Sequence, residues 1–188
     1  MGNITIEVVR DDNIEPCRAL CNELMAFQQS KATMLPEVFD AMNFDTRMKR
    51  SYDQAPESQV IVAKDDGVPI GYVFSTIDQP DERSRNAYPD WAPRGGKGFY
   101  PNWDDLPAKI GCLNNLYVRD GYRAMKLGSK LFDMSIDWLE SSPNVDIIFI
   151  YVSNGNDAAL NFYLSRGFTY SHEVFGGFIK AVYKFTRK

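Results

Sequence analysis

Residues 154–168 read NGNDAALNFYLSRGF, and this stretch says more about the fold than any other part of the chain. Asn156 or Asp157 can cap a helix, because each side chain can accept a hydrogen bond from an unpaired N–H group at a helix start. The apolar residues that follow share one helix face, and Gly167 suits the position just past a helix end. The stretch predicts a short helix over residues 157–165 that packs on a sheet.

A second informative stretch, residues 116–129, reads LYVRDGYRAMKLGS and predicts a strand that runs into a helix. The first N–H groups of a helix lack partners and lie at the positive end of its dipole, so a phosphate binds there readily. Arg123 could add a charge-assisted contact, and Gly128 allows a ligand or another backbone to approach closely. Taken alone, the stretch also fits a simpler interpretation, in which Arg123 and Lys126 are solvated residues at a helix start.

Hydrophobic periodicity places the other elements around these two stretches. Asp11 and Asp12 are the expected caps of a first helix that runs to about Gln29. The other expected elements are a strand from Ile4, a helix over 36–52, a hairpin of 59–63 and 70–76 around Asp65-Asp66-Gly67, a strand over 109–118, a helix over 125–139, a buried strand over 145–152, and a terminal strand pair, 168–174 and 178–185. The order β-α-α-β-β-β-α-β-α-β-β predicts an α/β fold with a mixed sheet.

Size and composition indicate an ordinary globular protein. The 188 residues fit a single domain over 1–188, with 44% hydrophobic and 24% charged residues. The formal net charge of −4 argues against a general nucleic-acid binder, which should be basic.

The cysteines and the apolar runs narrow the class further. Cys17, Cys21 and Cys112 are too few and too scattered for a disulfide framework, and no matching Cys or His set predicts a metal site. No apolar run approaches the roughly 18 residues that span a bilayer, and the start of the chain does not read as a signal peptide. We therefore expect a cytoplasmic protein without a membrane partner.

Residues 78–107 form an unusual segment, rich in proline and aromatic residues. It is too long for a simple connection, so we expect a functional or mobile loop inserted in the domain. Its aromatic residues are Tyr88, Trp91, Phe99, Tyr100 and Trp103.

Together, in this order and spacing, the two informative stretches resemble the GNAT acetyltransferase superfamily. In that family's acetyl-CoA pyrophosphate loop, a strand ending in Val is followed by Tyr-Arg and a Gln/Arg-x-x-Gly-x-Gly/Ala frame, which residues 123–128 fill. The family's Asn-x-x-Ala-x-x-Phe-Tyr-x-x-x-Gly-Phe helix is matched at Asn156, Ala159, Phe162, Tyr163, Gly167 and Phe168. The motifs cover about residues 110–175. The resemblance implies the GNAT fold, a mixed central sheet with a splayed strand pair.

The resemblance also implies a reaction, in which a primary amine attacks the thioester of acetyl-CoA directly. Pantetheine would lie between the strands over 109–118 and 145–152, and a backbone N–H of the first strand would meet the oxyanion. Tyr163 occupies the family's general-acid position, and Asn156 would hold pantetheine or fix its helix start. The residues so assigned to acetyl-CoA are Leu116, Tyr117, Val118, Arg123, Ala124, Met125, Lys126, Leu127, Gly128, Ser129, Asn156 and Ala159.

The sequence departs from the family pattern in two places. Lys126 replaces the first Gly of the phosphate loop, where its side chain would either crowd the pyrophosphate, contact phosphate as a cation, or point outward. Many family members carry an acidic base about where Asn114 or Asn115 lies, and Asn cannot take a proton. Other candidates for the base are Asp104, Asp105, His172 and Glu173.

The acceptor stays open at this stage between a small-molecule amine and a protein amine. The loop over 78–107 could cover the acceptor side, where its aromatic residues with Asp104 and Asp105 would suit an amine with an apolar or cationic part. Alternatively, these aromatic residues pack down on the domain or form the contact of a homodimer.

A competing interpretation is a GNAT-fold module that binds CoA or a partner with weak or no catalysis. Lys126 and the missing carboxylate favour it, and the intact motif from Asn156 to Tyr163 opposes it. A dinucleotide-binding protein is disfavoured, because no Gly-rich turn follows the first strand.

Overall fold

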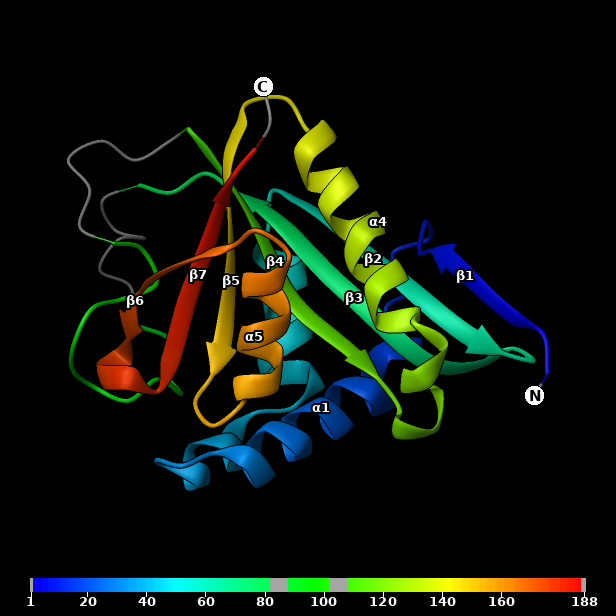
Figure 1. Cartoon of the computed structure of the whole chain (residues 1–188), viewed down its shortest axis with the longest axis horizontal. Coiled ribbons are helices and arrows are strands. Elements are labelled where there is room, and N and C mark those ends of the chain that lie inside the picture. The colour runs from blue at the N-terminus through cyan, green and yellow to red at the C-terminus, as the bar shows by residue number, and fades with distance from the viewer. Residues whose placement is uncertain (1, 82–87, 102–107, 187–188) are drawn as a thin grey trace.

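The computed structural model describes residues 2–81, 88–101 and 108–186, and within them the chain forms one seven-stranded sheet in the order β1-β2-β3-β4-β5-β7-β6 (Figure 1). Of the pairs of neighbouring strands, β4 and β5 are parallel and the others antiparallel. The strands are β1 (Ile4–Val8), β2 (Glu57–Asp65), β3 (Val68–Asp78), β4 (Lys109–Val118), β5 (Val145–Ser153), β6 (Thr169–Val174) and β7 (Ile179–Phe185). The α-helices are α1 (Arg18–Lys31), α2 (Arg50–Gln54), α4 (Leu127–Ser141) and α5 (Asp157–Ser165). The predicted mixed sheet and element order are confirmed.

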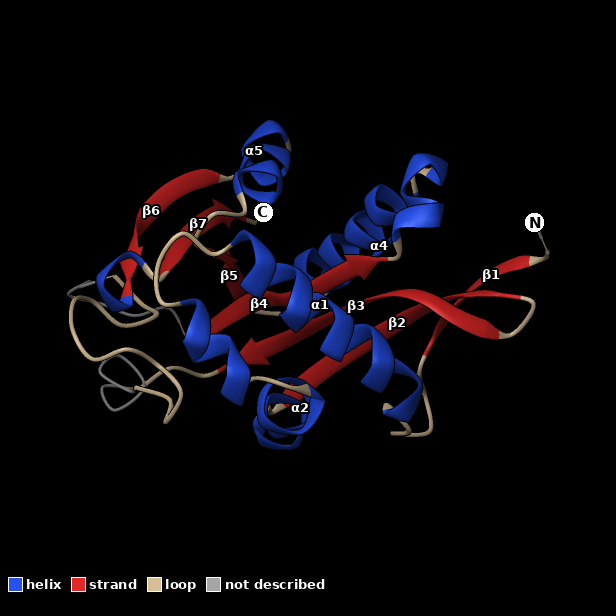
Figure 2. Ribbon diagram, turned by 90° about the horizontal axis from the view of Figure 1, so that it is seen from below, coloured by secondary structure: helices blue, strands red, loops and turns tan. Residues whose placement is uncertain are grey.

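Helices cover both faces of this sheet. Figure 2 shows α4 and α5 on one side of it and α1 and α2 on the other. The alternation along β2 explains why both faces are apolar: Val60 and Val62 join the core beneath α1, and Ile61 and Ala63 join the core beneath α4 and α5. The chain therefore has two cores, one on each side of the sheet.

The first helix begins later than predicted. Asp12 takes a left-handed φ of 57°, and the Asp11 carboxylate accepts a hydrogen bond from the Asn13 N–H instead of capping a helix. A 3-10 turn over Glu15–Cys17 comes next, and α1 starts only at Arg18. Asp11 and Asp12 are therefore not helix caps, because the turn around them keeps the backbone out of the helical region.

The single helix predicted over residues 36–52 is also wrong. The structure has a 3-10 helix over Pro36–Ala41, a π-helix over Phe44–Lys49, and then α2. The break lies at Asn43, whose extended backbone lets its side chain accept hydrogen bonds from the N–H groups at the start of the π-helix. A strong cap inside the expected helix thus starts a new one.

The remaining elements match the sequence predictions closely. Asp66 and Gly67, with φ of 46° and 82°, form the turn of the predicted hairpin between β2 and β3. The bounds of β4 and α5 are those predicted. The helix expected from Met125 begins at Leu127, because Lys126 takes a left-handed φ of 58° after a 3-10 helix over Asp120–Met125.

Two absences hold for the described residues. No helix among them is both long and apolar enough to cross a bilayer. No group of three His, Cys, Asp or Glu side chains among them is placed to hold a metal ion. The three cysteines are buried free thiols.

Candidate active site

The sheet opens in its middle, between its two parallel strands. Pairing between β4 and β5 runs from Lys109 with Val145 to Leu113 with Ile150 and then stops. Beyond these pairs the two strands diverge, as Figure 1 shows. The last five residues of β4 therefore present an edge that β5 does not cover.

The hydrogen-bond pattern shows which backbone groups lie on this open edge. Arg119 N–H donates to the Ile70 carbonyl at 3.0 Å, and the register pairs Tyr72 with Tyr117. In an antiparallel ladder, residues alternate between facing the partner strand and facing away. Tyr117 therefore points its N–H and C=O groups at β3, and Leu116 and Val118 point theirs toward the opening.

A β-bulge lies where the opening begins. Phe74 pairs with Asn115 and Ser75 with Leu113, so Asn114 is the extra residue of β4. The Asn114 side-chain amide donates to Thr76 Oγ1 at 2.9 Å. Bulges of this kind re-aim backbone and side chains and are common beside active sites.

The start of α4 offers free backbone donors. Its first hydrogen bond runs from the Lys130 N–H to the Lys126 carbonyl at 3.1 Å, so the N–H groups of residues 127–129 precede the helical ladder. No side chain caps them. This is the arrangement of donors and dipole that binds a phosphate.

Arg123 folds back toward the open edge of β4. Its Nε donates to the Val118 carbonyl at 3.0 Å, and its guanidinium lies 5.0 Å from the ring centre of Phe27 in α1. It also forms an ion pair with Asp120 at 2.7 Å. The Lys126 ammonium forms no ion pair with any described residue, so its charge is free for an anion.

The start of α5 is fixed by Asn156. Its side-chain oxygen accepts a hydrogen bond from the Ala159 N–H at 3.4 Å, so Asn156, and not Asp157, is the cap. Of the two roles expected of Asn156, this contact corresponds to fixing the start of its helix.

Tyr163 lies in the seam between α5 and α4. Its ring centre is 6.0 Å from that of Phe132 in α4 and 6.4 Å from that of Phe168, and only 7% of its surface is exposed. Burial raises the pKa of its phenol, so the group stays protonated at neutral pH. Its hydroxyl has no hydrogen-bond partner among the described residues. It is therefore free to donate to a bound group.

Asn154 is a structural residue that the motif reading did not single out. Its buried side-chain oxygen accepts hydrogen bonds from the N–H groups of Thr33 and Met34 at 2.7 and 2.9 Å. Its amide nitrogen donates to the Phe178 carbonyl at 3.1 Å. Beside it, Gly155 has a φ of 76° and leaves no room for a Cβ next to the Lys31 carbonyl. These contacts hold the end of α1 against β5 and β7.

On the α1 side of the sheet, a cavity of about 400 Å³ reaches the open strands. Its wall comes from the π-helix, the end of β3, the bulge of β4, the end of β5 and the described part of the long loop. Lining residues that bear on its chemistry are Arg47, Asp78, Trp91, Asn114, Tyr151 and Ser153. The cavity therefore lies on the α1 side of the sheet, whereas α4 packs on the other side.

Asp78, the last residue of β3, is a carboxylate that the sequence analysis did not select. Burial raises the pKa of this carboxyl above its ordinary value. Thr76 Oγ1 donates to its Oδ2 at 3.3 Å, and Thr76 in turn accepts from Asn114. A chain of polar groups therefore connects Asp78 to the bulge.

Of the four base candidates named from the sequence, the structure describes His172 and Glu173. His172 bonds the Gly98 carbonyl through Nε2 at 3.0 Å and Ser171 Oγ through Nδ1 at 2.8 Å, and burial lowers its pKa. Neither His172 nor Glu173 lines the cavity. Asp104 and Asp105 lie outside the described residues.

The described part of the long loop packs on the domain and borders the cavity. Phe175, after β6, meets the rings of Tyr88, Trp91 and Phe99 at centre distances of 5.1, 5.9 and 4.9 Å. Tyr88, Trp91 and Phe99 also line the cavity. Trp103 lies outside the described residues.

A splayed parallel strand pair, a bulge at its mouth and an uncapped helix start define an acyltransferase-type site. The chain matches the model of the acetyltransferase (GNAT) family over residues 24–168, and it belongs to this family. It is therefore an N-acetyltransferase that depends on acetyl-CoA.

Solved structures share this fold at low sequence identity. PaiA N-acetyltransferase from Thermoplasma acidophilum, in complex with coenzyme A, is 15% identical with a TM-score of 0.63, over 97% of this chain and 99% of that one. The GNAT acetyltransferase of Streptococcus pneumoniae is 18% identical with a TM-score of 0.59, over 98% and 100%. Naa50 of Arabidopsis thaliana, in complex with the bisubstrate analogue CoA-Ac-MVNAL, is 15% identical with a TM-score of 0.59, over 96% and 97%. No curated protein gives a match.

Proposed function

We propose that this enzyme acetylates a primary amine that enters the cavity beneath α1 and directly attacks acetyl-CoA held between β4 and β5. The observation that carries the proposal is the open edge of β4. Its unpaired backbone groups lead from the uncapped start of α4 to the polar cavity on the other side of the sheet.

The chain offers groups that fit each part of acetyl-CoA. The amide groups of pantetheine can pair with the free backbone of Leu116 and Val118, as an added strand would. The Val118 carbonyl has a second lone pair beside the one that Arg123 occupies. Within the expected stretch 124–129, the free N–H groups of residues 127–129 and the Lys126 ammonium suit the pyrophosphate. Arg123 lies at the same entrance.

The proposed reaction forms one C–N bond and breaks one C–S bond. Acetyl-CoA supplies an activated acetyl thioester. The N–H groups at the bulge of β4, around Asn114, are suited to stabilise the oxyanion that develops on the acetyl oxygen. Tyr163 donates its proton to the leaving thiolate, because its phenol is protonated and its hydroxyl has no other described partner.

The amine must lose a proton during the same reaction. Asp78 is our candidate for the base, since its pKa lies above that of an ordinary carboxyl and it lines the cavity next to the bulge. The proton that Asp78 gains passes to solvent, and Tyr163 recovers its own proton from solvent. Each turnover thereby releases the acetylated amine and free CoA thiol.

The Tyr163→Phe variant tests the proposal. Loss of one acid catalyst should lower kcat about 10- to 1000-fold. Because the hydroxyl has no described partner, the melting temperature and the Kd for CoA should stay at the wild-type values. Phe162→Leu, on the same helix, serves as a packing control. A Tyr163→Phe enzyme with wild-type kcat would exclude Tyr163 as the acid.

A further inference from the structure

Arg47 is a cation without a counterion on the wall of the acceptor cavity. Its Nε is buried with no hydrogen-bond partner, and its guanidinium lies 4.5 Å from the ring centre of Trp91. No described carboxylate pairs with it. The ionisable groups whose charges would act on Arg47 are Cys21, Cys112 and Tyr72. Burial raises the pKa of all three, so each is neutral at pH 7.

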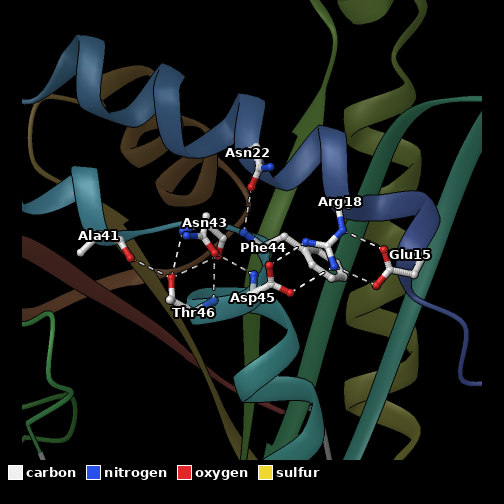
Figure 3. Close-up of polar contacts among 8 residues, drawn as sticks. All are labelled: Glu15, Arg18, Asn22, Ala41, Asn43, Phe44, Asp45 and Thr46. Carbon is white, nitrogen blue, oxygen red and sulfur yellow. Dashed lines mark hydrogen bonds and ion pairs between the residues drawn. The ribbon is translucent and has the colours of Figure 1, made fainter.

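The segment that carries Arg47 is firmly anchored. Figure 3 shows the capping box in which Asn43 accepts from the Thr46 N–H at 3.2 Å and Thr46 Oγ1 accepts from the Asn43 N–H at 3.0 Å. In the same view the Phe44 N–H donates to Asn22 of α1 at 2.8 Å, and Arg18 of α1 bonds Asp45 at 2.7 Å. The start of the short π-helix is thus tied to α1 at Phe44 and Asp45, just before Arg47 in the sequence. Single π-helical turns are rare in proteins overall, and those that occur are often found at functional sites.

The buried, unpaired guanidinium of Arg47 points to an anionic ligand in the cavity. Burial of an unpaired cation is unfavourable, and proteins retain one where it meets an opposite charge. Stacking on Trp91 holds the guanidinium plane in place, and its planar fork suits a bidentate contact with a carboxylate.

The other charges of the cavity narrow the choice of anion. Arg50, one turn further along, already pairs with Asp90 at 3.3 Å, which leaves Arg47 as the free cation on the described wall. Asp78 adds a carboxyl to the same cavity. A ligand with one negative charge is enough to balance Arg47, and a positive group on the same ligand would balance Asp78.

We propose that the acceptor is a small amine that carries a carboxylate, which Arg47 binds while its amino group faces Asp78 and the bulge of β4. This inference rests on the function proposed above. The volume of about 400 Å³ suits a molecule of amino-acid size. A diamine would place a second cation against Arg47. A peptide N-terminus would bring an amide where the carboxylate is expected.

The test compares amines that differ only in the carboxylate. Phenylalanine and phenethylamine form one pair and leucine and isoamylamine another, with putrescine and a short peptide as further acceptors. CoA thiol release gives kcat and KM for each. A charge-assisted contact is worth about 10- to 100-fold in kcat/KM, so at least one amino acid should exceed its decarboxylated partner by about that factor.

Arg47→Met then removes the charge but keeps much of the side-chain length. We expect it to raise KM for the preferred amino acid about 10- to 100-fold, leave the decarboxylated partner unchanged, and leave the Kd for acetyl-CoA unchanged. Lys49→Met is the matched control, because Lys49 lies on the same segment, pairs with Asp53 at 2.6 Å and does not line the cavity. Arg47→Lys, which keeps the charge, should recover part of the loss if Arg47→Met folds poorly.

The outcomes separate the two proposals. Equal kcat/KM within both pairs, or preference for putrescine or the peptide, overturns the carboxylate inference and leaves the acetyltransferase proposal intact. Failure of the wild-type protein to bind acetyl-CoA in a calorimetric titration overturns the proposed site itself. A loss in Arg47→Met that affects both members of a pair equally assigns Arg47 a structural role and also overturns the inference.

Discussion

The left-handed backbone at Lys126 makes a prediction with two measurable parts. Lys126 has φ of 58° and ψ of 18° and precedes the first residue of α4. A left-handed conformation costs a residue with a Cβ about 1–2 kcal/mol, and glycine avoids this strain. Glycine also loses more backbone freedom on folding, which offsets about 0.5–1 kcal/mol of the gain. Lys126→Gly should therefore raise the free energy of unfolding by about 0.5–1 kcal/mol.

The same substitution removes a free ammonium from the helix start. A cation that contacts phosphate at an exposed site is worth about 0.5–1 kcal/mol, so Lys126→Gly should weaken acetyl-CoA binding about two- to fivefold. Lys126→Asn is the matched variant, because asparagine tolerates the left-handed region but carries no charge. It should bind acetyl-CoA as weakly as Lys126→Gly.

Two measurements decide the matter: chemical denaturation for stability and calorimetric titration for the Kd of acetyl-CoA. A less stable Lys126→Gly protein would refute the strain argument. Tighter binding by Lys126→Gly than by the wild type would refute the charge argument and show that the Lys side chain crowds the pyrophosphate.

Two further predictions concern Asp78 and Asn154. The pKa of Asp78 is raised on folding, so the folded state holds this proton more tightly than the unfolded state does, and the associated stability is lost as pH rises from the unfolded to the folded pKa. Asp78→Asn should therefore unfold at a higher denaturant concentration than the wild type at pH 7. The same variant should also lose the fall in kcat/KM at low pH. An unchanged fall at low pH would exclude Asp78 as the base. Asn154→Ala leaves the N–H groups of Thr33 and Met34 without their acceptor and should cost about 2–4 kcal/mol of stability. The exposed Asn161→Ala is its control, and equal stability of the two variants would contradict the contacts described.

Much of the fold could be predicted because local signals and tertiary structure agree. β4 and α5 have the predicted bounds, since an apolar alternation and a cap with a glycine stop are decided by residues next to one another in sequence. The helix predicted over 36–52 failed because Asn43 can be read as an ordinary helix residue. Its capping role depends on a backbone conformation that Asn22 of α1 helps to fix through Phe44.

The acceptor side of the site was much less accessible from the sequence. Tyr163 and the start of α4 belong to motifs with fixed spacing, so the sequence points to them directly. Arg47 and Asp78 belong to no motif, and they lie more than 30 residues apart in sequence on a π-helix and a strand end. Only the folded chain shows that both line one cavity.

The central claim is that acetyl-CoA enters between β4 and β5, and amide hydrogen exchange with and without CoA tests it most directly. We predict that saturating CoA slows exchange at the N–H groups of Leu116 and Val118 and at residues 127–129. Tyr117, whose N–H already pairs with β3, should change little. Saturable binding of CoA with unchanged exchange at Leu116, Val118 and the start of α4 would contradict the account.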